Sequence, residues 1–178
     1  EVEAFLTEDA RAILTTNIDN MYEKGVYANV PGAHSTKHIE DVMLFATIIG
    51  KAINLDNHDL QLLVEAAKYH DSGRIRDFDR RNFRYQSSDE EIDKHGLVSA
   101  KKAREELAGK YSEEDIKIIA IAIELHVPRV NAKLIEELCE KYKVDTKDEQ
   151  LVSRLSKIVL ALKDADALDR TRFRAHIS

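Results

Sequence analysis

Apolar side chains recur at steps of three and four residues along most of the chain, a period that places them on one face of an α-helix. In residues 34–55 this apolar stripe is Ile39, Val42, Met43, Ala46, Ile49 and Ile53. The other segments predicted to be helical are 7–25, 56–73, 95–110, 111–128, 131–144 and 146–173. No stretch alternates apolar and polar residues as a strand would. The pattern therefore predicts an all-α, single-domain bundle of about six to eight helices.

Local signals mark the ends of several of these helices. Residues that favour helix starts are Thr7, Asp56 or Asn57, and Ser112 with Asp115 three positions later. Gly73 is placed to stop one helix and Pro128 another. Residues 74–94 lack periodicity and are dense in charge, which predicts a long loop with room for one helical turn. Because long loops in compact domains are usually functional, this segment is the expected lid or specificity segment.

The composition fits a compact globular protein. Apolar residues make up 43% of the 178, with six glycines and two prolines, which argues against disorder and low complexity. The formal net charge of −6 disfavours binding to a nucleic-acid backbone. It leaves room for a small phosphorylated ligand that a metal ion or a few arginines hold locally.

Cysteine use and hydropathy indicate a cytoplasmic protein without a membrane partner. The single cysteine, Cys139, cannot form an intramolecular disulfide and fits a reducing compartment. No run approaches the ~18 apolar residues of a membrane span, and the first ten residues lack the features of a signal peptide. Because the chain opens with Glu1 rather than Met, we expect a trimmed chain or a domain cut from a longer protein.

The histidines are the main candidates for chemistry, and there are seven of them: His34, His38, His58, His70, His95, His126 and His176. Several lie at helix ends or beside apolar stripes, where side chains can converge on one pocket between helices. Imidazole together with carboxylate suits Fe, Mn, Co, Ni or Zn, and the lack of thiolate pairs argues against a structural zinc site. His58 is expected at the surface or as a helix cap, and His176 in the tail of the chain.

The doublet His70–Asp71 follows an apolar helical run. Neighbours on a helix project about 100° apart, so both side chains could reach one ion, although an ordinary helix terminus fits the dipeptide too. His38 precedes an apolar stripe and also fits a buried, hydrogen-bonded histidine. Near the end of the last predicted helix lie three carboxylates, Asp164, Asp166 and Asp169. They oppose the negative end of the helix dipole, which is costly unless a cation compensates; a solvated charged face is the alternative.

Taken in order, these segments resemble the HD-domain superfamily of metal-dependent phosphohydrolases. That family is defined by a His, a His-Asp doublet and a distant Asp on an all-α core. The matching segments are "HSTKHIEDV", "AAKYHDSGR" and "KDADALDR". The segments "HGLVSA" and "IELHVP" resemble the extra-histidine segments of subgroups that bind two metals. The resemblance spans residues 25–174, the expected HD-type domain, with residues 1–24 as an N-terminal helix of the same compact unit.

The resemblance implies a ligand set and a reaction. The implied metal ligands are His38, His70, Asp71, His95, His126 and Asp166. They would hold one or two divalent transition metal ions, Mn, Fe, Ni, Co or Zn. Asp71 would bridge the two ions because its two oxygens can bind separate metals, and a metal-bound hydroxide would be the nucleophile. The expected reaction is hydrolysis of a phosphomonoester or phosphodiester, of a nucleotide or a similar small metabolite.

Further residues are assigned to catalysis and to the substrate. The expected catalytic residues are His70, Asp71 and Arg74, and the expected substrate contacts are Arg74, Arg170 and His34. An arginine can grip phosphate oxygens with two parallel hydrogen bonds, but Arg74 could equally be an exposed helix-end residue. Arg170 could instead pair with Asp164 or Asp169. Asp164 is also a candidate to hold a ligand histidine in place.

Two other functions fit the same residues. Some relatives with histidine-rich HD sites use two irons and dioxygen for oxidative cleavage, and a non-catalytic nucleotide-sensing module is the other alternative. The expected partner is a small phosphorylated substrate, without nucleic acid or membrane. The pattern leaves the oligomeric state open, with a homodimer as one option.

Overall fold

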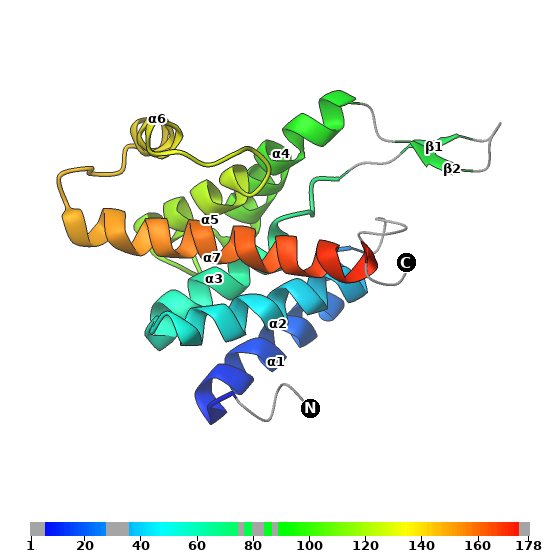
Figure 1. The fold of residues 1–178 in the computed structure, drawn as a ribbon, viewed down its shortest axis with the longest axis horizontal. Coiled ribbons are helices and arrows are strands. Elements are labelled where there is room, and N and C mark those ends of the chain that lie inside the picture. The colour runs from blue at the N-terminus through cyan, green and yellow to red at the C-terminus, as the bar shows by residue number, and fades with distance from the viewer. Residues whose placement is uncertain (1–5, 28–35, 75–76, 80–83, 87–88, 175–178) are drawn as a thin grey trace.

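The computed structural model describes residues 6–27, 36–74, 77–79, 84–86 and 89–174, with the backbone alone within 77–93 and 172–174. Over these ranges the chain forms seven α-helices and one two-stranded hairpin (Figure 1). In chain order they are α1 (Glu8–Glu23), α2 (Thr36–Ala52), α3 (Asn57–Tyr69), β1 (Asp77–Asp79), β2 (Arg84–Gln86), α4 (Asp89–Leu107), α5 (Glu113–Leu125), α6 (Ala132–Tyr142) and α7 (Glu149–Arg174). The predicted all-α bundle is confirmed. None of the helices in these ranges is both long and apolar enough to cross a membrane.

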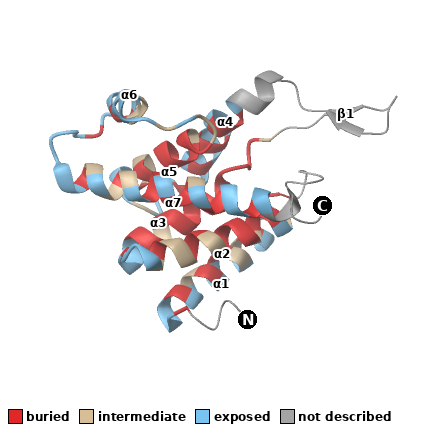
Figure 2. Cartoon of the chain, viewed as in Figure 1, coloured by how far each residue is buried: buried red, intermediate tan, exposed pale blue. Residues whose placement is uncertain are grey.

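The helices α3 and α5 form the centre of the bundle, and they pack against each other. Helices α1, α2 and α7 pack against α3, while α4, α6 and α7 pack against α5. From Asp59 to Tyr69, every side chain of α3 except Gln61 is buried, as is the run Ile118–Ile123 of α5. Figure 2 shows the same gradient, with buried positions on the inner helix faces and a largely exposed α6 at the edge. Side chains just beyond the C-termini of α3 and α5 therefore enter the core.

Three helix starts follow the prediction. The side-chain oxygens of Thr7, Asp56 and Ser112 accept hydrogen bonds from the backbone N–H three residues later, at 3.4, 2.8 and 3.1 Å. Asp56, rather than Asn57, is the cap of α3. These caps fix where α1, α3 and α5 begin, and thus which residues fall at their C-terminal ends.

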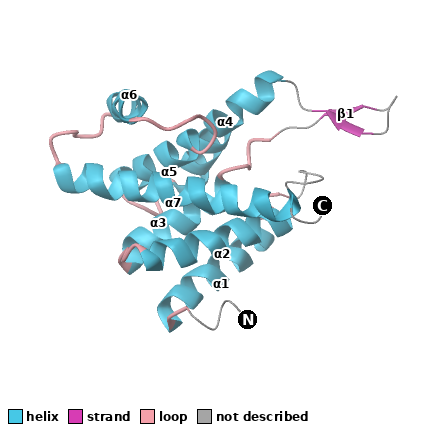
Figure 3. Cartoon of the chain, in the orientation of Figure 1, coloured by secondary structure: helices cyan, strands magenta, loops and turns pink. Residues whose placement is uncertain are grey.

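The prediction of a long loop over residues 74–94 is wrong in two respects. β1 and β2 pair antiparallel, with Phe78 opposite Tyr85 (Figure 3). Helix α4 begins at Asp89, so His95 lies in its second turn instead of at its start. The acidic run "DEE" suits the positive end of a helix dipole and marks the start of α4. The side chains of residues 75–93 lie outside the described part of the chain, so the role of this segment in specificity stays a prediction.

Gly73 has a different role from the predicted one. Helix α3 ends at Tyr69, and Gly73 is absent from the positive-φ glycines of the described chain, so no left-handed C-cap explains it. Instead, a Cβ on Gly73 would lie 2.5 Å from the backbone nitrogen of Ser99 and 2.8 Å from Cβ of Val98. The backbone N–H of Gly73 donates to Oγ of Ser99 at 2.8 Å. Glycine is thus required because α4 packs directly onto the turn after the His-Asp doublet.

We expect Gly73→Ala to destabilise the protein by about 1–3 kcal/mol, because the added methyl group meets backbone atoms of α4 that cannot move aside. Denaturant unfolding monitored by circular dichroism measures this change. Gly96→Ala is the comparison, since its Cβ would lie 3.2 Å from the carbonyl oxygen of Ile123, a wider approach than the 2.5 Å at Gly73, and a smaller loss is expected. Equal losses in the two variants would contradict the proposed close contact.

Candidate metal centre

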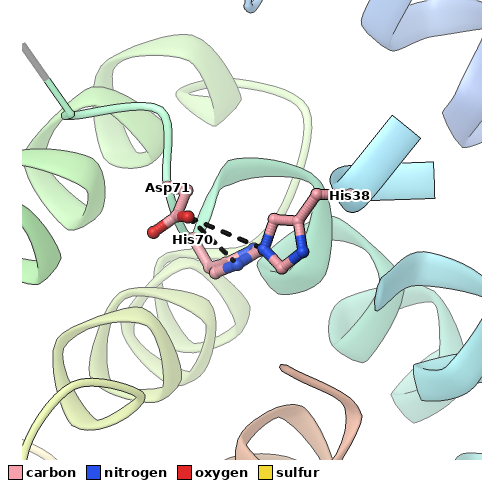
Figure 4. Close-up of side chains that lie close together, drawn as sticks. All are labelled: His38, His70 and Asp71. Atoms are coloured by element: carbon pink, nitrogen blue, oxygen red, sulfur yellow. Dashed lines mark ion pairs between the residues drawn. The ribbon is translucent and has the colours of Figure 1, made fainter. Parts of the chain in front are cut away.

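Six side chains from separate parts of the sequence meet in the core of the described chain. They are His38 from α2, His70 and Asp71 after α3, His95 from α4, His126 after α5, and Asp166 from α7. All six are buried. Figure 4 shows the ring of His38 and the doublet, which converge from α2 and from the end of α3. The structure therefore brings together every residue of the expected ligand set.

The two oxygens of Asp71 face two different groups of histidines. Oδ2 lies 3.7 Å from Nε2 of His38 and 3.8 Å from Nε2 of His70. Oδ1 lies 3.2 Å from Nε2 of His95 and 3.5 Å from Nε2 of His126. Asp71 thus stands between two clusters of ligand atoms, as a bridging carboxylate would.

Asp166 completes the first cluster. Its Oδ1 lies 3.5 Å from Nε2 of His38 and 3.8 Å from Nε2 of His70. In the second cluster, the Nε2 atoms of His95 and His126 are 3.0 Å apart. Ligand atoms about 2.1 Å from one ion stand about 3.0–3.4 Å apart at octahedral or tetrahedral angles. The second cluster falls close to this range, and the first is slightly wider.

Backbone carbonyls select the metal-binding tautomer of two histidines. Nδ1 of His70 is 2.7 Å from the carbonyl oxygen of Ala67, and Nδ1 of His126 is 2.5 Å from that of Ile123. A carbonyl oxygen can only accept, so each Nδ1 carries the proton and each Nε2 presents a lone pair to the cluster. No described group makes a hydrogen bond with Nε2 of His70, although that atom is buried. A buried nitrogen atom with a lone pair and no hydrogen-bond donor beside it is suited to coordinate a metal ion.

The electrostatics keep His70 neutral. Burial lowers its pKa from 6.5 to about 4, because the interior disfavours imidazolium more strongly than the nearby Asp71 stabilises it. The pKa of Asp166 is lowered as well, which for a carboxyl group favours the charged form. Burial alone would raise its pKa, but His70 and Arg170 bring the pKa below its ordinary value. At neutral pH the set therefore holds a neutral imidazole and an ionised carboxylate, the forms that bind metals.

A further carboxylate holds His38 in place. Nδ1 of His38 donates to Oδ2 of Asp169 at 2.6 Å, and Asp169 is buried. The prediction that Asp164 would hold a ligand histidine is wrong, since Asp164 is exposed on the outer side of α7. The spacing contained the signal: residues three apart share a helix face, so Asp169 follows Asp166 inward.

The predicted arginines contact the two carboxylates of the set. Nε of Arg74 lies 2.8 Å from Oδ1 of Asp71, and the Arg74 side chain is only 12% exposed, which excludes the reading as an exposed helix-end residue. Arg170 reaches Asp166 with Nη2 and, at 3.2 Å, with Nε, rather than the suggested Asp164 or Asp169. His34 lies outside the described residues. His58 is at the surface, as predicted, where it contacts Asp115 at 2.9 Å.

Two lysines that the sequence pattern did not single out hold the backbone beside the ligands. Nζ of Lys102 on α4 donates to the carbonyl oxygen of Ser72 at 3.0 Å. Nζ of Lys163 on α7 donates to the carbonyl oxygens of His126, at 3.0 Å, and of Pro128. Both place a positive charge at the C-terminal end of a central helix, where the helix dipole is negative.

Comparison with known proteins agrees with this geometry. The family model of the HD domain matches residues 36–171, which include every residue of the candidate centre. The chain belongs to the HD domain family. HD domains are typically metal-dependent hydrolases, and the buried His and Asp groups of this HD domain could hold a metal. Searches of curated proteins and of solved structures found no match.

We expect Asp169→Asn to weaken metal binding by about 10- to 100-fold, because the amide no longer fixes the ring and tautomer of His38. Competition with a chelator of known affinity measures the change. Asp164→Asn is the matched control on the same helix and should stay within about twofold, since it removes an exposed carboxylate. Unchanged affinity in Asp169→Asn would show that Asp169 does not orient the ligand.

Proposed function

We propose that this HD domain is a metal-dependent phosphohydrolase that cleaves a phosphomonoester or phosphodiester of a nucleotide or similar small metabolite. The observation that carries the proposal is the position of Asp71, with one oxygen toward His38 and His70 and the other toward His95 and His126. A buried carboxylate shared between two imidazole clusters suits a pair of divalent ions.

The chain supplies two sets of ligands under this proposal. His38, His70 and Asp166 would hold one ion together with Oδ2 of Asp71. His95 and His126 would hold the other with Oδ1. When bound, such ions lower the pKa of a coordinated water and withdraw charge from phosphoryl oxygens. The donor set of nitrogen and oxygen atoms suits the borderline divalent ions Mn, Fe, Co, Ni and Zn.

The charges around the site favour an anionic substrate. The carboxylates of Asp71, Asp166 and Asp169 are nearly balanced by Arg74 and Arg170. Divalent ions on the carboxylates would make the site strongly positive, and a phosphate ester would restore the balance. With the carboxylates of Asp71 and Asp166 on the ions, the guanidinium groups of Arg74 and Arg170 would donate to phosphoryl oxygens.

We expect the purified protein to contain about one to two transition metal ions per chain, and His70→Ala or Asp71→Ala to lose both metal and turnover. Elemental mass spectrometry and a panel of nucleotides and cyclic nucleotides measure the two properties. His58→Gln, at an exposed histidine, is the control that should keep both.

Full activity of the chelator-treated wild type would rule out the proposed function. The same assay without dioxygen separates hydrolysis from di-iron oxidation, because hydrolysis proceeds without oxygen. Tight nucleotide binding with no product would indicate a sensing module instead.

We expect Arg74→Gln to lower kcat/KM by about 100-fold while the metal content stays unchanged, because a charged donor to the phosphoryl group is lost. Steady-state kinetics and elemental analysis on the same sample make this comparison. Arg11→Gln, on the outer side of α1, removes the same charge far from the site and should retain activity. A parallel loss of metal and turnover in Arg74→Gln would instead assign Arg74 a structural role in holding Asp71.

A further inference from the structure

A second polar cavity, separate from the metal centre, lies where α1 and α3 meet the turn after α4. Its volume is about 380 Å³. The charged residues among those that line it are Lys24, Glu65, Lys68 and Lys110. Three of these four residues are lysines, in a chain whose formal net charge is −6.

The charged side chains on the inner wall of this cavity are paired with each other. Nζ of the buried Lys68 contacts Oε2 of Glu65 at 2.6 Å and donates to the amide oxygens of Asn17 and Asn20 at 2.9 and 3.1 Å. Glu65 also accepts from the hydroxyl of Tyr111 at 3.0 Å. Lys68 and Glu65 thus neutralise each other, and the wall is held in a fixed arrangement. Because Oδ1 of Asn20 faces the ammonium, the amide nitrogen of Asn20 is turned away from it.

The rim of the cavity carries the excess charge. Lys24 follows α1 and Lys110 follows α4, both are exposed, and neither forms an ion pair with a carboxylate within the described part of the chain. Lys110 donates only to the backbone carbonyl of Glu106, at 2.6 Å. Lys24 and Lys110 line the same cavity, and the nearby Lys110, together with partial burial, lowers the pKa of Lys24, while Glu106 acts in the opposite direction. Two ammonium groups over a neutral wall, with Glu106 as the nearby carboxylate, leave a net positive rim.

We propose that this cavity binds the phosphate group of a small phosphorylated metabolite, with Lys24 and Lys110 as the charged contacts. An anion between the two ammonium groups replaces their repulsion with two attractive contacts, and compact ammonium groups suit phosphate oxygens. The amide nitrogen of Asn20 adds a neutral donor at the wall. The site is distinct from the metal centre, to which Lys24 and Lys110 contribute nothing, and binding there requires no metal.

The competing explanation is that each lysine only stabilises the end of its helix. Lys24 is the C-cap of α1, and Lys110 contacts a carbonyl in the last turn of α4. In that case the cavity has no affinity for phosphate. The two explanations predict the same fold but different affinities for phosphate.

The test uses methylenediphosphonate, a diphosphate analogue that hydrolases do not cleave, and titration calorimetry of the whole chain with and without chelator. Binding that the chelator removes belongs to the metal centre, and binding that persists belongs to this cavity if it also depends on Lys24 and Lys110. Lys24→Gln/Lys110→Gln should weaken the persistent binding by about tenfold or more, because two charged contacts are lost. The matched control, Lys101→Gln/Lys133→Gln, removes two charges from lysines that are 77% and 84% exposed, and should change affinity less than about twofold.

Two results would overturn the proposal. One is the absence of any chelator-resistant binding in the wild type. The other is equal weakening in the two double variants, which would reflect net charge alone. Since all four lysines are exposed, circular dichroism should report intact folds for both double variants. If the metal centre does not bind metal, only the chelator-sensitive binding will be absent.

Discussion

The buried carboxylate of Asp71 is the constraint around which this HD domain is organised. A lone ionised carboxylate in a protein interior is strongly unfavourable, so it requires positive charge or hydrogen-bond donors from several directions. In the structure Arg74 provides one such contact. The imidazoles of His70 and His126 turn lone pairs rather than donors toward the cluster, so the rest of the compensation suits a cation that Asp71 and the imidazoles would share. Those imidazoles arrive from α2, α3, α4 and α5, which means that the helices must meet at this point. The packing of these helices and the assembly of the site therefore depend on the same residues.

The manner in which the histidines are held differs from one to another. The carbonyls of Ala67 and Ile123, which belong to the last turns of α3 and α5, hold His70 and His126. A backbone acceptor is preserved by any side-chain substitution that keeps the helix. His38 instead depends on the side chain of Asp169 on α7. His38 is therefore more vulnerable to a single side-chain substitution than His70 or His126, although all three surround the same carboxylate.

Sequence reasoning predicted the parts of the molecule that follow from local patterns. The helical period, the caps at Thr7 and Ser112, and the order of His and Asp motifs were sufficient for the fold class and for the residues that converge. Errors arose where three-dimensional contact decides. Gly73 is required by the approach of α4, and the inward turn of Asp169 in place of Asp164 depends on how α7 lies against α2. The first relation is not visible within a window of one helix, whereas the three-residue spacing from Asp166 already placed Asp169 on the same helix face.

Helix α7 alone supplies Asp166, Asp169 and Arg170 to a centre whose other members all come from residues before it along the chain. Its connection to α6, residues 143–148, is a short exposed segment apart from Val144. The centre is therefore shared between two stretches of chain that could be separated at that link. Cleavage there would leave two fragments, each with an incomplete set of ligands, and metal would favour their reassociation by adding bonds that neither fragment can make alone. A bound ion would thus connect α7 to the rest of the protein, and the amount of metal retained would report whether α7 is docked.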